Sequence, residues 1–260
     1  MLAHGLPRAC SFRSPSSLTT STTSSLLRPS YLLSPSHHHN VRIQQHARHQ
    51  HSSSTPTPAP QPKTGLKHNR LVIGMTGATG AIYGIKALQY LRTLGVETHL
   101  IMSKWAHATI KYETSYSVGD VAALATGKSW PIRDMAAPMS SGSWRSDGML
   151  VAPCSMKTLA AIRTGYAEDL IARSADVVIK ERRPLVLVVR ETPMSVIHLE
   201  NMLALARMGV IIFPAVPAFY TRPKDLDDIV NHSVARMLDC FGIEVEGLMP
   251  PEGRWEGFRP

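Results

Sequence analysis

Acidic residues are missing from the first quarter of this sequence: none of the 19 Asp and Glu residues of the 260-residue chain lies before residue 71. Eight of the 28 Lys and Arg residues do, so residues 71–260 carry 20 basic residues against 19 acidic ones. The formal net charge of +9 is therefore mostly a property of the front of the chain. Because the remainder is nearly neutral, the charge does not support a nucleic-acid-binding protein.

Other absences narrow the class of protein further. The three cysteines, Cys10, Cys154 and Cys240, are far apart and form no C-x-x-C pair, which argues against a disulfide framework or a zinc site. No apolar run approaches the ~18 residues that a membrane-spanning helix needs. A hydrophobic content of 43% is ordinary for a globular domain. We therefore expect a globular protein without a transmembrane segment.

Residues 1–68 are rich in Ser, Thr, Pro and His and show no helical or strand period. Such a segment cannot bury enough apolar surface to offset the loss of chain entropy, so we expect it to be disordered. Scattered arginines and many hydroxyl groups in an acid-free stretch are typical of an organellar transit peptide. They favour a mitochondrial leader over a plain disordered tail, and the His37–His39 run is interpreted as low complexity rather than a metal site.

The pattern over residues 69–250 predicts one domain, followed by a tail at 251–260. Short apolar runs predict strands at 70–76, 97–102, 148–152, 185–189 and 210–213. Helical periods lie between and after them, at 81–94, 104–112, 155–164, 170–182, 195–208 and 224–241. Strands that are apolar on both faces and separated by helices indicate a parallel sheet covered on both sides. The expected fold is therefore α/β, doubly wound, Rossmann-like of the flavodoxin kind, with ligands at the carboxyl ends of the strands.

Glycines and small hydroxyl residues follow the first three expected strands. The turn from Gly74 to Gly80 opens a helix with the spacing G-x-x-G-x-x-G, which is not the dinucleotide fingerprint. It favours a mononucleotide, although a turn that only packs a helix tightly would look the same. Ser103 and Ser155 each precede an expected helix, and a helix N-cap is a sufficient explanation for either serine alone. Two such helix starts at one sheet edge favour a shared anion or cofactor site.

Charged and aromatic residues follow the later strands. Arg190 and Glu191 end the apolar run at 185–189, where the cost of burying charge must be offset by pairing or by a ligand, so they indicate a functional role. Tyr220 lies in the loop after the last expected strand, and Arg236 lies within the last helix. Spacing alone leaves these two open, since core packing and an exposed helix face explain them equally well.

Taken together, these motifs resemble the UbiX family of flavin prenyltransferases, including fungal mitochondrial members formerly labelled phenylacrylic acid decarboxylases. The resemblance runs from about Arg70 to Met249. It rests on the strings GMTGATGAIYG, SGSWRSDGMLVAPCSMKTLAAI, IARSADVVIKERRPLVLVVRETP and PAFYTRP. Of these, IKERRPLVLVVRETP is the most specific, because it combines a strand and its flanking charges in one order.

The resemblance implies a site for reduced FMN and dimethylallyl phosphate, without a metal. The residues that would hold FMN are Gly77, Ala78, Thr79, Ser103, Ser155, Met156, Lys157, Thr158 and Arg190. Those that would bind the phosphate of the donor are Arg173, Lys180, Tyr220 and Arg236. Glu191 would act as the acid or base, with Lys180 at the departing phosphate and Trp144 offering an aromatic face to the allylic carbon. Glu113 matches a further family acid whose role is left open.

The chemistry of the implied reaction suits these residue types. Loss of phosphate from a dimethylallyl group leaves an allyl cation, so Lys and Arg would stabilise the anionic leaving group and an aromatic ring would face the cation. Reduced flavin would take the prenyl group at N5 and close a ring through C6, with Glu191 or the departing phosphate as base. No D-D-x-x-D cluster is present to bind magnesium.

The resemblance also implies a homo-oligomer, a dodecamer with sites between subunits, whose product is used by a UbiD-type decarboxylase. Three alternatives remain. A relative of phosphopantothenoylcysteine decarboxylase would carry a P-x-M-N motif, which is missing here. A decarboxylase could instead act directly on cinnamic-type acids. A non-enzymatic FMN carrier would need neither Glu191 nor the phosphate-binding cations. Whether the donor is the monophosphate or the diphosphate is also left open.

Overall fold

The computed structural model describes residues 64–245, 248, 254 and 257. The chain divides into two units, Met1–Thr55 and Pro56–Pro260, and every described residue belongs to the second. Residues 1–63 of the expected leader, and most of the expected tail at 251–260, therefore lie outside the described part of the chain.

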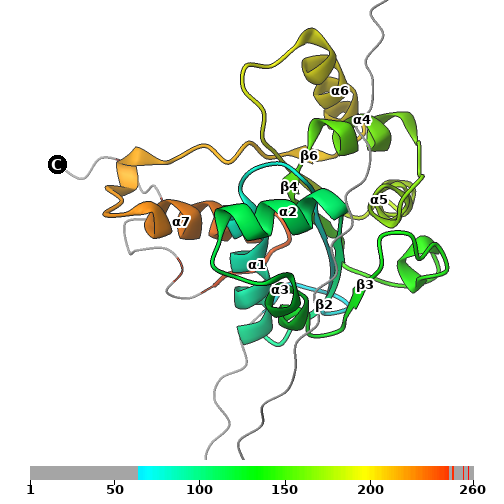
Figure 1. Cartoon of the computed structure of the whole chain (residues 1–260), viewed down its shortest axis with the longest axis horizontal. Helices are drawn as coiled ribbons and strands as arrows, with labels where there is room; N and C mark the ends of the chain where they lie inside the picture. The colour runs from blue at the N-terminus through cyan, green and yellow to red at the C-terminus, as the bar shows by residue number, and fades with distance from the viewer. Residues whose placement is uncertain (1–63, 246–247, 249–253, 255–256, 258–260) are drawn as a thin grey trace, which may run out of the picture. The chain divides into compact units, whose positions relative to one another are not determined.

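Within the described residues, six strands form one parallel sheet with the order β3-β2-β1-β4-β5-β6. Their bounds are β1 Arg70–Met75, β2 Glu97–Met102, β3 Lys128–Trp130, β4 Met149–Cys154, β5 Leu185–Val189 and β6 Ile211–Ile212. The order runs outward from β1 in one direction and from β4 in the other, so the connections change direction between these two strands. Figure 1 shows β2 and β3 toward one end of the sheet and β4 and β6 toward the other. The doubly wound α/β prediction is confirmed.

Helices cover both faces of the sheet. Their bounds are α1 Ala81–Thr93, α2 Lys104–Glu113, α3 Val118–Leu124, α4 Met156–Thr164, α5 Leu170–Lys180, α6 Val196–Arg207 and α7 Leu226–Asp239, with short 3-10 helices at Pro138–Ser140 and Phe219–Thr221. Helices α1, α2, α3 and α7 pack on one face, and α4, α5 and α6 pack on the other. None of the described helices combines the length and apolar character needed to cross a membrane.

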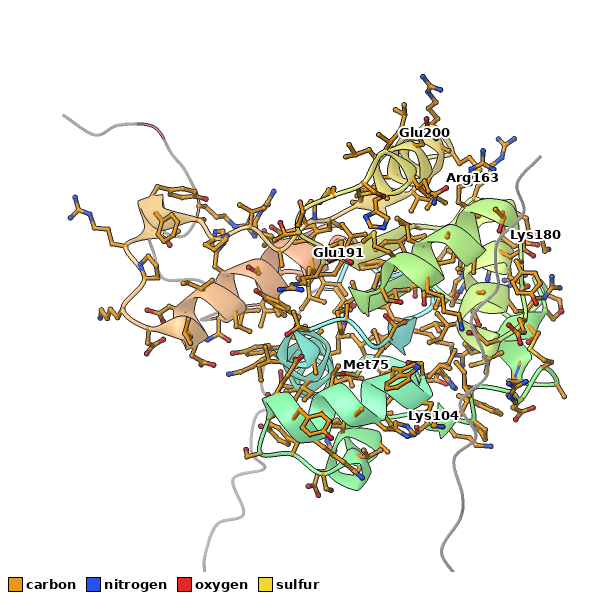
Figure 2. All side chains as sticks on the ribbon, turned by 45° about the horizontal axis from the view of Figure 1, so that its top comes forward. Met75, Lys104, Arg163, Lys180, Glu191 and Glu200 are labelled. Carbon is orange, nitrogen blue, oxygen red and sulfur yellow. The ribbon has the colours of Figure 1, made fainter. Side chains whose placement is uncertain are left out.

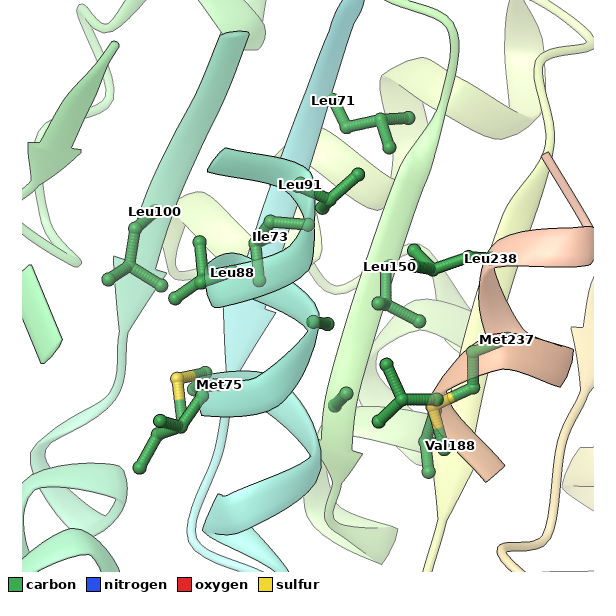
Figure 3. Close-up of a cluster of buried hydrophobic side chains, with 14 of the residues drawn as sticks. Leu71, Ile73, Met75, Leu88, Leu91, Leu100, Leu150, Val188, Met237 and Leu238 are labelled. Carbon is green, nitrogen blue, oxygen red and sulfur yellow. The ribbon is translucent and has the colours of Figure 1, made fainter. Parts of the chain in front are cut away.

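Alternating strand residues supply the two halves of the core. In β1, Leu71 and Ile73 point to the face with α1 and α7, whereas Val72 points to the other face. Figure 3 shows the first half, in which Leu88 of α1 and Leu238 of α7 pack over the strands. This burial on both faces explains why the strands read as continuous apolar runs in the sequence.

Two elements were not expected from the sequence. Strand β3 has only three residues, Lys128–Trp130, and lies at the edge of the sheet with partly exposed side chains, so it lacks an apolar run. Helix α3 has seven residues and buries only Val121, which is too little for a helical period to emerge. The strand expected at 210–213 is confined to Ile211–Ile212.

The last five residues expected to belong to the leader are bonded to the domain. Thr64 forms an antiparallel bridge with Ile243. The carboxylate of Asp147 accepts hydrogen bonds from the backbone N–H groups of Lys67, His68 and Arg70 at 2.7 to 3.0 Å. The chain is thus attached to the domain from Thr64 onward.

Helix α1 lies very close to the sheet at Gly84. A Cβ atom at this position would stand 2.3 Å from the carbonyl oxygen of Ala152 in β4, which real Cβ atoms do not tolerate. The absence of a side chain therefore lets α1 settle over β1 and β4. That contact sets the position of the glycine-rich turn from which α1 starts.

Candidate functional site

Thr76 joins the loops that follow β1 and β4. Its backbone N–H and its hydroxyl both donate to the carbonyl oxygen of Pro153, at 3.1 and 2.8 Å. The same hydroxyl accepts the backbone N–H of Ser155 at 2.8 Å. Thr76 is buried, so these bonds are shielded from water. They hold the glycine-rich turn beside the start of α4, at the point where doubly wound folds bind ligands.

The glycine-rich turn continues from Thr76 through Gly77, Ala78 and Thr79. A Cβ atom on Gly77 would stand 2.2 Å from the Cβ of Trp105, so the turn passes directly against α2. Gly80 has a φ of 100°, a left-handed conformation that glycine adopts without strain. Two glycines thus shape the turn in different ways. Gly77 allows the turn to approach α2 closely, and Gly80 allows the backbone to bend into α1.

Glu113 caps the start of α1. Its Oε2 atom accepts the backbone N–H groups of Gly80 and Ala81 at 2.8 and 3.1 Å. These two N–H groups are therefore bonded within the protein, and a phosphate at the start of α1, as the turn suggested, would have to compete with a carboxylate. Glu113 is the last residue of α2, so this contact also ties α2 to α1.

Ser103 and Ser155 are both helix N-caps. The hydroxyl of Ser103 accepts the N–H of Ala106 at 3.0 Å, and that of Ser155 accepts the N–H of Thr158 at 3.4 Å. The Ser155 and Thr158 hydroxyls lie 3.2 Å apart. The first N–H groups of α4 have no partner within the helix, and no acidic residue lies in its first turn. The start of α4 is therefore a better position for an anion than the start of α1, where Glu113 accepts the first N–H groups.

We use the name carboxyl-edge site for residues 76–80, Ser103 and residues 155–158. Arg190 and Glu191 follow β5 at the same edge of the sheet. Arg190 is exposed and Glu191 is partly exposed, with its Oε1 accepting the N–H of Thr192 at 3.0 Å. The premise that these charges are buried is therefore wrong for a single subunit, although their position at the carboxyl edge is as expected.

Cys154 lies among these loops but is not reactive. The residue ends β4 and is fully buried. Burial raises the pKa of its thiol to about 12, because a thiolate would lose its hydration there. The raised pKa disfavours the thiolate at neutral pH, which argues against Cys154 as a nucleophile.

Two of the expected donor-binding residues lie on α5. The guanidinium of Arg173 pairs with Asp176 at 2.9 Å and donates to the carbonyl oxygen of Ser140 at 3.2 Å. Lys180 pairs with Glu181 at 2.5 Å, and this contact lowers the pKa of Glu181. Both cations are partly exposed, so they could bind an anion from solution.

Lys180 and Glu191 lie at opposite ends of a strand. Lys180 ends α5 before β5 begins, and Glu191 follows the end of β5. The five residues of β5 span roughly 17 Å. Figure 2 shows Lys180 well to the side of Glu191. The chain by itself therefore does not bring these two predicted catalytic residues together.

Tyr220 contacts α7 at His232, a residue that sequence reasoning missed. The ring of Tyr220 lies edge-on to the ring of His232, with 6.0 Å between centroids. His232 and Arg236 are four residues apart and so share a face of the helix. Arg236 pairs with Asp239 at 2.6 Å. The spacing of four residues between His232 and Arg236 was the sequence feature that could have identified His232.

Trp144 lies away from the carboxyl edge. Its ring meets His99 edge-on, with 5.0 Å between centroids, and the guanidinium of Arg70 lies 5.0 Å from its centre. Its carbonyl oxygen accepts a hydrogen bond from Arg183. Arg70 begins β1 and Arg183 precedes β5, so Trp144 lies at the amino edge of the sheet. Within one subunit it does not face the carboxyl-edge site.

Metal ligands are not gathered at any of these positions. Across residues 64–245 and the three isolated described positions, no group of three or more His, Cys, Asp and Glu side chains could hold an ion. The arrangement at the carboxyl-edge site consists instead of hydroxyl groups, backbone N–H groups and small side chains, which suit a phosphorylated organic ligand.

The flavoprotein family model matches residues 60–238. Mitochondrial flavin prenyltransferase PAD1 of Saccharomyces cerevisiae is 61% identical over 190 residues, which cover 73% of this chain and 76% of that protein. Flavin prenyltransferase UbiX of Neisseria meningitidis serogroup B is 50% identical over 188 residues, which cover 72% of this chain and 97% of that protein.

Solved structures agree with these matches. The crystal structure of AnUbiX (PadA1) in complex with FMN and dimethylallyl pyrophosphate superposes with a TM-score of 0.70 at 59% identity, covering 73% of this chain and 98% of that one. A dodecameric FMN-dependent UbiX-like decarboxylase from Escherichia coli O157:H7 superposes with a TM-score of 0.69 at 60% identity, covering 72% of this chain and all of that one.

Replacing Glu113 by Ala should destabilise the protein by about 1–2 kcal/mol, because two N–H groups at the start of α1 lose their carboxylate partner. Glu113→Gln keeps an oxygen acceptor and should lose less. Urea unfolding of each variant measures the effect. Glu168→Ala, which removes an exposed carboxylate between α4 and α5, is the control. Equal midpoints for Glu113→Ala and Glu168→Ala would show that the cap contributes nothing.

Proposed function

Because the chain belongs to the flavoprotein family, among the UbiX-type flavin prenyltransferases that its sequence resembles, we propose that its carboxyl-edge site binds reduced FMN as the acceptor of a dimethylallyl group. The observation that carries this proposal is the 59% identity, over nearly the whole of that chain, to a structure holding FMN and dimethylallyl pyrophosphate. The residues of the site are consistent with it.

The carboxyl-edge site fits the phosphate of FMN. A phosphate at the start of α4 would meet the first N–H groups of the helix and the hydroxyl groups of Ser155 and Thr158, with the exposed cation of Lys157 in the same turn. Gly77 and Ala78 present no bulky side chain, so backbone atoms of the turn can approach a flat ring. Thr79, Ser103 and Met156 border the same loops, and exposed Arg190 adds a cation. The reduced flavin supplies nucleophilic N5 and C6 atoms when bound.

We propose that Arg173, Lys180, Tyr220 and Arg236 bind the phosphate of the donor. A phosphate accepts several charge-assisted hydrogen bonds at once, and three cations and a phenol can supply them. The same cations stabilise the negative charge that grows on the phosphate as its bond to the allylic carbon breaks. Glu191 takes up the proton released at ring closure, and Trp144 faces the allyl cation.

These residues meet only if sites form between copies of the chain. Lys180 and Trp144 lie at the opposite edge of the sheet from Glu191 in one subunit, so a complete site needs a second copy. Exposed apolar side chains offer a surface for assembly: Val196, Ile197, Leu199 and Leu203 of α6 are each at least half exposed. The dodecameric state of the Escherichia coli relative supports a dodecamer here.

We further propose that residues 1–63 direct the protein to mitochondria and that its product serves a UbiD-type decarboxylase. The name of the yeast relative supports the first point. A fusion of residues 1–63 to a fluorescent protein should colocalise with mitochondria, whereas a fusion of residues 64–260 should not, because an acid-free basic leader responds to the membrane potential. Diffuse cytosolic fluorescence from the first fusion would contradict the leader.

Glu191→Gln should lower prenyl transfer by roughly 10²–10⁴-fold while FMN remains bound, because the amide cannot accept the proton. The protein is incubated anaerobically with reduced FMN and either dimethylallyl monophosphate or diphosphate, and the flavin is analysed by mass spectrometry for one added five-carbon unit. Glu200→Gln, on the exposed face of α6, is the matched control.

The same assay separates the alternatives. An unmodified flavin from the unaltered protein would overturn the prenyltransferase. Release of carbon dioxide from cinnamate without a second protein would favour the direct decarboxylase. Full activity of Glu191→Gln would be compatible with a prenyltransferase but would show that Glu191 is not its acid or base. Modified flavin that activates an apo UbiD-type decarboxylase would support the proposed partner.

Mixed oligomers test whether the site is shared. Each single variant, Lys180→Met or Glu191→Gln, should be inactive in prenyl transfer. When the two variants are co-expressed in equal amounts, about one quarter of the unaltered activity should return. Random pairing gives about that fraction of the shared sites an intact Lys180 from one chain and an intact Glu191 from the other. Co-purification through two different affinity tags verifies that mixed oligomers form. No recovery in verified mixed oligomers would mean that both residues act from the same subunit.

A further inference from the structure

A pocket of about 550 Å³ lies beside α2 and next to the carboxyl-edge site, because two of its lining residues flank Ser103. Trp105 and Glu113 of α2 touch the glycine-rich turn, whereas the pocket is lined by other residues of this helix. Figure 2 shows Lys104 at the start of α2. The complete lining comes from the end of β2, from α2, α3 and β3, and from the loop after β3: Met102, Lys104, His107, Val118, Ser129, Trp130, Pro131 and Ile132.

The lining combines an apolar body with a basic end. Five of its eight residues are apolar, and Lys104 and His107 are one helical turn apart on α2. Among the described residues, no carboxylate forms an ion pair with Lys104. Lys104 also lies in the first turn of α2, where the helix dipole favours negative charge. A ligand that satisfies this lining has an apolar body and one anionic group.

Trp130 is held rigidly as one wall of the pocket. Its indole N–H donates to Nδ1 of His99 at 2.9 Å. Because an indole only donates, Nδ1 of His99 accepts, and the ring proton lies on Nε2, which is 2.7 Å from Glu97. Arg70 pairs with Glu97 at 2.7 Å, and the ammonium of Lys128 lies 3.9 Å from the centre of the Trp130 ring.

This chain of contacts keeps Glu97 ionised. The hydrogen bond from Arg70 is the main reason that the pKa of Glu97 lies below its usual range, with His99 adding to the effect. An ionised Glu97 holds the tautomer of His99, and His99 in turn fixes the orientation of Trp130. Because the Trp130 side chain is already held in place, it would lose little side-chain entropy when the flat ring of a ligand packs against it.

We propose that this pocket binds a small aromatic carboxylate, whose ring packs against Trp130 and whose carboxylate is bound by Lys104 and His107. Its volume lies within the range of small-molecule sites. The pocket borders the carboxyl-edge site, because Met102 and Lys104 flank Ser103, but it shares no residue with that site. The proposed ligand is bound in addition to the flavin and the prenyl donor.

The test uses the full chain saturated with FMN and measures binding by titration calorimetry. The probes are 2-naphthoate and its uncharged isostere 2-naphthamide. Naphthoate should bind at least about tenfold more tightly than naphthamide, because only the acid forms a charge-assisted bond. Lys104→Met should remove this preference and leave naphthamide binding unchanged. Lys111→Met, an exposed lysine near the other end of α2, should behave like the unaltered protein.

A second variant keeps the proposal testable if Lys104→Met disturbs the helix. Val118→Phe fills the pocket from α3 and should weaken both probes while FMN stays bound. Equal affinities for the two probes, no binding of naphthoate, or equal losses in Lys104→Met and Lys111→Met would each overturn the proposal. Release of flavin during the titration would also overturn it, because the probe would then occupy the carboxyl-edge site.

Discussion

The buried hydroxyl of Thr76 is the contact on which the carboxyl-edge site depends. It donates to the Pro153 carbonyl and accepts from the Ser155 N–H, so one side chain fastens the loop after β1 to the helix that follows β4. Loss of that hydroxyl would leave the Ser155 N–H without its partner, at a cost of about 1–3 kcal/mol, and would leave the Pro153 carbonyl with the Thr76 N–H as its donor. Gly84 contributes to the same arrangement, because the close approach of α1 to β4 positions the loop after β1 beside the loop after β4.

Parallel topology then decides what one subunit can and cannot assemble. Every crossover helix returns the chain to the amino edge, so the end of α5 and the residue after β5 must lie at opposite edges of the sheet. Lys180 and Glu191 are only eleven positions apart in the sequence, yet the strand between them separates them. A site that uses both must be completed by another copy, and the exposed apolar face of α6 is consistent with such contacts.

Strands that are buried on both faces could be predicted from the sequence, because β1, β4 and β5 are largely continuous apolar runs. The loops after them were therefore found as well. Contacts between residues distant in the sequence could not be found in this way. Glu113 reaches back 33 positions to Gly80, and Thr76 bonds a residue 79 positions later. Neither contact leaves a periodic signal, and the position of Trp144 at the amino edge depends on folding of the whole sheet.

The cations that we propose to bind the donor already have partners within the chain. Arg173, Lys180 and Arg236 each form an ion pair with an acidic residue one to three positions away. These pairs are partly exposed, and such surface pairs contribute only about 0–1 kcal/mol. A phosphate carries more charge than a carboxylate and accepts bonds from several cations together. It can therefore draw each cation away from its neighbouring carboxylate at small cost.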